Sequence, residues 1–180
     1  MSNYTYQKSL QALWQKAVDL YAKGQRGADT YFNDEEQAFL DSIGATAQEV
    51  YDFAEDFNNS GDPDFATFAM LQDQRRSYFL EVQKGVRSDK VVGPPDLPPK
   101  DAATEGITWL PRIIEKAKVK LRGEMDPDLM YGCGGDRNFF RTHDIHPSEF
   151  LRVVRESDGD DNQVISWVLQ RSKAQETASA

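Results

Sequence analysis

Cysteine is almost absent from this chain of 180 residues, since Cys133 is the single one. One thiol cannot form an intramolecular disulfide, which excludes a disulfide-framed secreted scaffold and favours a reducing compartment. The first residues, MSNYTYQKSLQALWQK, also lack the basic-then-apolar order of a signal peptide. The sequence therefore predicts a cytoplasmic protein.

Long hydrophobic runs are missing as well. No apolar stretch approaches the roughly 20 residues that a membrane-spanning helix needs, so no membrane segment is expected. Hydrophobic residues make up 39% of the chain and charged residues 28%, which is typical of folded proteins rather than disordered ones. A chain of this length suits one domain or two small ones.

Positive charge is scarce in the first half of the chain. Residues 1–84 hold 7 Lys+Arg against 14 Asp+Glu, whereas residues 110–180 hold 11 against 12. An acidic surface repels phosphate backbones, which argues against nucleic-acid binding. The basic positions of the second half fit either a solvated helix face or a patch for a small anionic ligand or an acidic protein partner.

Helix signals organise residues 1–85. Apolar residues recur at helical spacing over residues 5–23, and a polar cap with glutamate three positions later opens each of the next two helices. An Asp-Pro pair opens a fourth, longer helix that ends near Gly85. The expected caps are Asn33, Thr46 and Asp62-Pro63.

Residues 86–106 change character, because they contain four prolines in two pairs. Proline disfavours both helix interiors and central strands, so this segment is expected to be an extended linker. The sequence does not distinguish a mobile linker from one that is packed on the surface.

Residues 107–174 again read as helices. An apolar stripe at helical spacing starts at Leu110, and further helices are expected after the N-caps Asp136 and Asp161 and at Pro147. The last residues, 175–180, are expected to form a flexible tail.

The hydrophobic skeleton of the second half repeats that of the first at an offset of one hundred residues. Leu10 aligns with Leu110, Lys16 with Lys116, and no gap is needed across about forty positions. Any two amphipathic helices share periodicity, so coincidence is the alternative. Because loop lengths are kept too, we expect an all-α fold of two tandem, pseudo-symmetric units, each of about four helices, joined by the Pro-rich linker.

Chemically active side chains gather between Cys133 and His146. Cys133, Asp136, His143 and His146 have the donor types for zinc, but their spacing fits no strong motif, and neither a metal nor a cofactor is expected. Cys133 in its Gly-rich loop is a candidate nucleophile with His143 as base, although Asp136 at the same helix end opposes thiolate formation. An inert, half-buried thiol is the alternative.

Arginine and aromatic side chains supply the candidate binding residues. Arg112, Arg137 and Arg141 are candidates to contact a ligand, and the alternative for Arg112 and Arg137 is that each pairs with a carboxylate of the C-terminal half. The tryptophans, with ten phenylalanines and seven tyrosines, either line a ligand cavity between the halves or fill the core.

The second half also resembles a known family. The segments WLPRIIEKAKVKLRGE, the Asp136-Arg137-Asn138-Phe139-Phe140 run, HPSEFLRVV and NQVISWVLQR are similar to a bacterial family catalogued as domain of unknown function 5069. The resemblance covers residues about 90–173, with a diverged repeat in residues about 8–84. It implies a small bacterial protein and supplies no activity, cofactor or catalytic residue. Family members tend to have a Gly-Ile-Asp type of turn where this chain has His143-Asp144-Ile145-His146.

Two functions follow as hypotheses. The first is a non-catalytic binding or protein-interaction module that uses the groove between the halves or the surface of Arg137 and Arg141. The alternative is a small enzyme or ligand carrier with a site near Cys133, Asp136, Arg137 and His143. The oligomeric state is not defined by the sequence.

Overall fold

The computed structural model describes residues 3–178, with side chains through Lys173. The described residues form eight α-helices, two short 3-10 helices and one two-stranded sheet, so the predicted all-α class is confirmed. The chain divides into two compact units, Met1–Arg87 and Ser88–Ala180.

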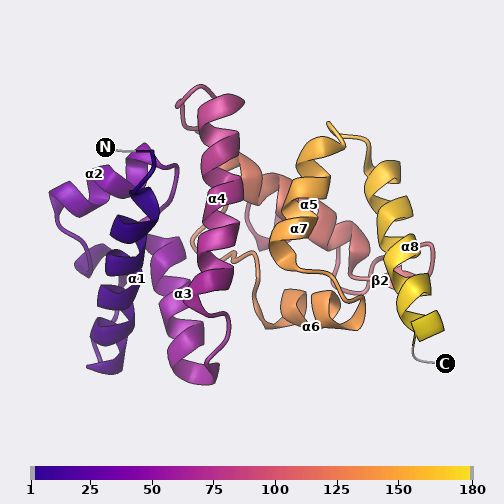
Figure 1. The fold of residues 1–180 in the computed structure, drawn as a ribbon, viewed down its shortest axis with the longest axis horizontal. Coiled ribbons are helices and arrows are strands. Elements are labelled where there is room, and N and C mark those ends of the chain that lie inside the picture. Colours follow the sequence, from indigo (N-terminus) through magenta and orange to yellow (C-terminus); the bar gives the residue numbers. More distant parts are fainter. Residues whose placement is uncertain (1–2, 179–180) are drawn as a thin grey trace. The chain divides into compact units, whose positions relative to one another are not determined.

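The N-terminal unit consists of four helices: α1 (Tyr6–Ala22), α2 (Asp34–Ser42), α3 (Ala47–Ser60) and α4 (Phe65–Glu81). The two predicted capping boxes are present, since Asn33 and Thr46 each accept a hydrogen bond from the N–H of the glutamate three residues on. Helix α1 lies beside α3 and also contacts α4 (Figure 1). The buried side chains are apolar and include Leu10, Leu13, Trp14, Val50, Phe53, Phe68 and Leu71.

The start of α4 differs from the prediction. The Asp64 carboxylate, not that of Asp62, caps the helix by accepting from the N–H of Thr67 at 2.9 Å, and Pro63 precedes the helix. Both aspartates match the cap preference, and the backbone conformation selects the second one.

The C-terminal unit begins with the proline-rich segment. Val92 and Leu97 are buried against Val119 and Leu129, and Val92 forms a parallel β-bridge with Met125. The segment is therefore packed on the unit rather than mobile. It includes the 3-10 helix η2 (Pro94–Asp96) and leads into a hairpin of β1 (Ala103–Thr104) and β2 (Ile107–Thr108).

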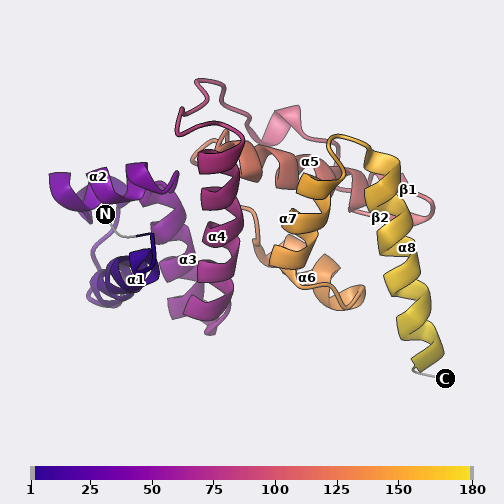
Figure 2. The ribbon, with the colours of Figure 1, turned by 45° about the horizontal axis from the view of Figure 1, so that its top comes forward.

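Four helices complete the C-terminal unit: α5 (Leu110–Arg122), α6 (Gly134–Thr142), α7 (Pro147–Glu156) and α8 (Asp161–Ala178). Helices α5, α7 and α8 pack against one another, β1 contacts α5, and α6 lies below α7 (Figures 1 and 2). Helix α8 continues to Ala178, into the stretch expected to be a flexible tail, whose last two residues lie outside the described part.

The start of α6 is a second correction. Its N-cap is Cys133, whose side chain makes no cap hydrogen bond, and Asp136 occupies the third helical position. Asp136 was expected to cap this helix, but its carboxylate is fully buried and is held by other elements of the unit. Because Asp136 lies within the helix instead of capping it, its carboxylate is at the centre of the candidate site.

Candidate functional site

Asp136 is the centre of a buried polar network. Its Oδ2 atom accepts hydrogen bonds from Lys116 Nζ at 2.5 Å and from the N–H of Gly132 at 2.9 Å. Its Oδ1 atom accepts from the indole N–H of Trp109 at 3.0 Å. Both members of the ion pair are almost fully buried, with side-chain exposures of 3% for Lys116 and 0% for Asp136. We call these residues the Asp136 network.

The network has a structural reason to exist. A buried carboxylate is strongly unfavourable unless it is paired and hydrogen-bonded, and here each oxygen has at least one donor. The charge of Asp136 also acts on its neighbours, because burial and then this charge raise the pKa of Tyr131 well above its usual value. The Tyr131 hydroxyl remains protonated and donates to the carbonyl of Pro147 at 2.9 Å.

Trp109 is a half-buried member of this network, and its backbone has a strained conformation. Its φ is 75°, in the left-handed region that a bulky side chain rarely adopts. Its N–H donates to the carbonyl of Ala102, and its own carbonyl accepts from the N–H of Ile113, each at 3.0 Å. A Cβ atom at Gly135 would lie 2.8 Å from the indole ring, so only glycine allows this close approach. Trp109 is thus held from four directions.

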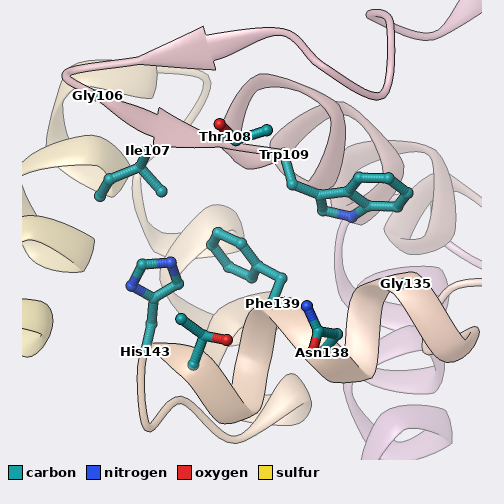
Figure 3. Close-up of a pocket in the computed structure, with 9 residues that line it drawn as sticks. Gly106, Ile107, Thr108, Trp109, Gly135, Asn138, Phe139 and His143 are labelled. Carbon is teal, nitrogen blue, oxygen red and sulfur yellow. The ribbon is translucent and has the colours of Figure 1, made fainter.

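A pocket of about 420 Å³ lies between the hairpin and α6. Phe139, Trp109, Ile107 and His143 supply its apolar and aromatic surface (Figure 3). Its other lining residues are Gly106, Thr108, Gly135, Asn138 and Thr142. We call this the hairpin pocket. A shallower hollow of about 430 Å³ lies along the first turns of α8 beside Trp167.

His143 is fixed in the wall of the hairpin pocket. Its ring packs against that of Phe139 at an interplanar angle of 49°, with centroids 4.7 Å apart, and its Nδ1 atom lies 2.8 Å from the Ser172 hydroxyl of α8. Burial lowers the pKa of His143 from its ordinary value of 6.5. The imidazole is therefore neutral at pH 7.

The catalytic candidates are only partly brought together. Cys133 is half-buried with its Sγ atom 3.4 Å from Lys116 Nζ, and Lys116 in turn pairs with Asp136. His143 contacts Phe139 and Ser172 instead of Cys133. His146 serves as N-cap of α7, where its Nδ1 accepts from the N–H of Ser148 at 3.2 Å. Among the side chains that the structure describes, those of residues 3–173, no three metal-ligating groups cluster.

The candidate binding arginines serve different roles. Arg112 is buried and donates to the carbonyl of Pro98 at 2.7 Å, so a backbone carbonyl takes the place of the expected carboxylate. Arg137 donates to the carbonyl of Gly132 at 2.8 Å. Arg141 lies exposed near the end of α6. None of the three lines the hairpin pocket.

Sequence reasoning missed the two residues that shape the site most. From the sequence, Lys116 is one of several basic residues expected on a solvated helix face. Trp109 is expected either in the core or in the lining of a cavity. Two signals were available in the sequence. Glu105-Gly106, followed by the β-branched Ile107 and Thr108, is typical of a hairpin turn, and Gly135 stands next to Asp136. Neither signal indicates that the residue after the hairpin, Trp109, packs against Gly135.

The C-terminal unit is thus a helical domain with an added hairpin and a pocket beside it. The family described as Domain of unknown function (DUF5069) matches residues 98–180, so this part of the chain is similar to that family. The resemblance noted from the sequence is confirmed for the C-terminal unit. The match begins at residue 98, so the diverged copy in residues 8–84 stays a prediction.

Two other comparisons returned no relative. No curated protein sequence and no solved structure matches the chain significantly. The described residues contain no helix with the length and hydrophobicity needed to cross a bilayer.

Proposed function

We propose that this protein is a non-catalytic binding protein whose C-terminal unit holds a small molecule in the hairpin pocket. The observation that carries the proposal is the pocket itself, which is lined by aromatic side chains and by the neutral polar side chains of Thr108, Asn138 and Thr142. Its volume of about 420 Å³ lies in the range of small-molecule sites, roughly 300–1,000 Å³.

The strain at Trp109 supports this choice of site. A bulky residue in the left-handed region costs on the order of 1–3 kcal/mol, and such strain clusters where a side chain must be held for binding. Here the Asp136 carboxylate and Gly135 hold the indole in place along the pocket wall. The buried ion pair then acts as the support of a binding surface rather than as reacting groups.

The catalytic alternative has weaker support. An enzyme with Cys133, Asp136, Arg137 and His143 as its site needs a base near the thiol, and the ring of His143 contacts Phe139 and Ser172. Asp136 is buried with both oxygens already engaged, which leaves it no role in proton transfer to a substrate. The contact between Lys116 and Cys133 is the observation that keeps this alternative open.

Blocking the pocket tests the proposal. Asn138→Trp would place a large ring in the pocket from α6, whereas Arg141→Trp adds the same ring at an exposed position of that helix outside the pocket. We expect members of a fragment library to shift the amide NMR signals of Gly106 and Gly135 in the wild type and in Arg141→Trp only. Fragments that bind all three proteins equally, or none at all, would contradict it.

The setting of this function is also proposed. The single cysteine favours a cytoplasmic protein, and the net charge of −9 argues against nucleic-acid binding. That the protein is bacterial is what the family resemblance implies. A protein partner or a small anionic ligand at the surface of Arg137 and Arg141 remains a second hypothesis. The hairpin pocket itself has no basic side chain to attract an anion.

Internal duplication is a further part of the proposal. Helices α2 and α6 begin and end one hundred residues apart, and α3 and α7 also begin at that offset. The ion pair repeats too, since Lys16 binds Glu36 at 2.6 Å and Lys116 binds Asp136 at 2.5 Å. Two unrelated helical units would not be expected to share a tertiary ion pair at equivalent positions.

A further inference from the structure

We infer that the ligand of the hairpin pocket is a small, uncharged, planar ring that donates an N–H or O–H hydrogen bond to Nε2 of His143. This inference rests on the proposed binding function and adds the chemical class of the ligand. It follows from the charge of the lining, from the hydrogen bonds of His143, and from the aromatic side chains around it.

The lining excludes a charged ligand. Its nine residues include no Asp, Glu, Lys or Arg, and the nearby ion pair of Lys116 and Asp136 is already neutralised internally. A charged molecule that enters this space loses hydration and finds no opposite charge, which makes its transfer unfavourable. A neutral molecule has no such cost.

The hydrogen bonds of Ser172 decide the tautomer of His143. The Ser172 hydroxyl has one hydrogen, and it donates that hydrogen to the carbonyl of Val168 at 3.0 Å. Both contacts of the Ser172 oxygen are satisfied together only when it accepts from Nδ1 of His143, so we take the neutral imidazole to carry its proton on Nδ1. The Nε2 atom is left with a lone pair and acts as an acceptor.

The orientation of the ring directs this acceptor to the ligand. In Figure 3 one ring nitrogen of His143 points toward α8 and the other toward the space below β2. Burial lowers the pKa of His143, so the lone pair on Nε2 is present at pH 7. A bound ligand must supply the complementary donor, because an acceptor that loses water without a new partner is unfavourable.

The remaining side chains favour a ring over a chain. Trp109, Phe139 and His143 all belong to the lining, and planar groups stack on such surfaces in offset or edge-to-face arrangements. Asn138 rises from α6 below Trp109 and, with Thr108 and Thr142, adds neutral donors and acceptors at the rim (Figure 3). A ring with an adjacent donor and acceptor satisfies both His143 and the rim.

Matched probes test the inference on the full chain. We would titrate 2-pyridone, N-methyl-2-pyridone, benzoate and benzylammonium into ¹⁵N-labelled protein and follow the amide signals of Gly106 and Gly135. We expect 2-pyridone to bind and its N-methyl form to bind about tenfold more weakly, because one hydrogen bond is lost. The two charged probes should leave these signals unchanged.

Two variants identify His143 as the acceptor. His143→Phe keeps an aromatic ring beside Phe139 and removes the acceptor, so 2-pyridone should weaken about tenfold while N-methyl-2-pyridone is unaffected. Ser172→Ala removes the hydroxyl that accepts from Nδ1, so the imidazole proton should no longer be confined to Nδ1. Its matched control on the same helix is Ser166→Ala, at an exposed position outside the pocket.

The outcomes separate the inference from the proposed function. The ¹⁵N shifts of His143 in the ligand-free protein should show a protonated Nδ1 and an unprotonated Nε2, and the reverse would overturn the inference. Equal binding of the two pyridones, or binding of benzoate in the pocket, would overturn the inference and leave the binding function standing. If neither these probes nor a wider library shifts the pocket signals, both fail.

Discussion

Each unit holds a lysine–carboxylate ion pair at matching positions one hundred residues apart, but the surroundings of the two pairs differ. Lys16 and Glu36 keep side-chain exposures of 38% and 23%, whereas those of Lys116 and Asp136 are 3% and 0%. In each unit one carboxylate oxygen also accepts a backbone N–H, from Asn33 and from Gly132 respectively. The shared geometry belongs to the helical scaffold, and the difference in burial marks the unit with the pocket.

The sequence around the pair explains this difference. One hundred residues before Trp109 and Gly135 stand Ser9 and Glu35, both exposed on helices. The N-terminal unit therefore has neither an indole to cover its carboxylate nor a glycine to let one approach. In the C-terminal unit the hairpin precedes α5 and inserts Trp109, which both buries the pair and creates the pocket. A lysine–carboxylate pair is therefore buried in the unit where the indole of Trp109 covers it and partly exposed in the unit that lacks this indole.

Replacing the lysine of each ion pair should give the largest difference in unfolding free energy between corresponding variants of the two units. Lys116→Ala leaves Asp136 buried without its counter-charge and should cost about 3–5 kcal/mol of unfolding free energy. Lys16→Ala breaks a partly exposed pair and should cost less than about 1 kcal/mol. Urea unfolding followed by circular dichroism measures both. Similar losses in the two variants would show that burial does not separate the pairs.

The glycines before Asp136 provide the next test. Gly135→Ala places a methyl group against the Trp109 ring and should destabilise the protein by about 1–3 kcal/mol through overpacking. Gly134→Ala meets no atom within 4 Å and should be neutral or stabilising by up to about 1 kcal/mol. Thermal unfolding compares the pair. A Gly135→Ala protein as stable as the wild type would remove the proposed role of Gly135.

Asp52 should make the N-terminal unit sensitive to pH. Burial, and then the charges of Glu49, Glu55 and Asp56, raise the pKa of Asp52 to about 7, while a hydrogen bond from Gln48 opposes the shift. The folded protein then holds a proton that the unfolded chain has lost, so stability falls as the pH rises from about 4 through about 7.

Asp52→Asn should remove this dependence and stabilise the protein at pH 8 by on the order of 1–2 kcal/mol. Urea midpoints measured between pH 4 and pH 8 for both proteins check it. A wild-type profile as flat as that of the variant would show that Asp52 titrates normally.

His143 should produce the opposite and smallest slope, in the C-terminal unit. Its folded pKa lies below 6.5, so the unfolded chain binds the proton more readily and stability is lost as the pH falls below about 6.5. His143→Gln removes the titrating group and should therefore abolish this loss of stability at low pH. NMR titration of the His143 ring measures the pKa directly. A value above 6.5 would reverse the expected slope.

Several elements were predictable because their signals are local. The caps Asn33 and Thr46 with their glutamates, and Pro147 at the start of α7, act within one helical turn, and each helix begins where these residues predict. The second cap position at Asp64 and the N-cap at Cys133 were missed, because several residues compete for a cap and the surrounding structure chooses among them.

The amino-acid sequence by itself determined the all-α class, the starts of α2, α3 and α7, the acidic composition and the family resemblance of the second half. These depend on periodicity, composition and contacts within a few residues. Only the tertiary structure decided that the proline-rich segment is packed, that Trp109 takes a left-handed conformation, and that Lys116 neutralises Asp136 twenty residues away. Those features require groups distant along the chain to exclude water together, and no local pattern encodes which groups will meet.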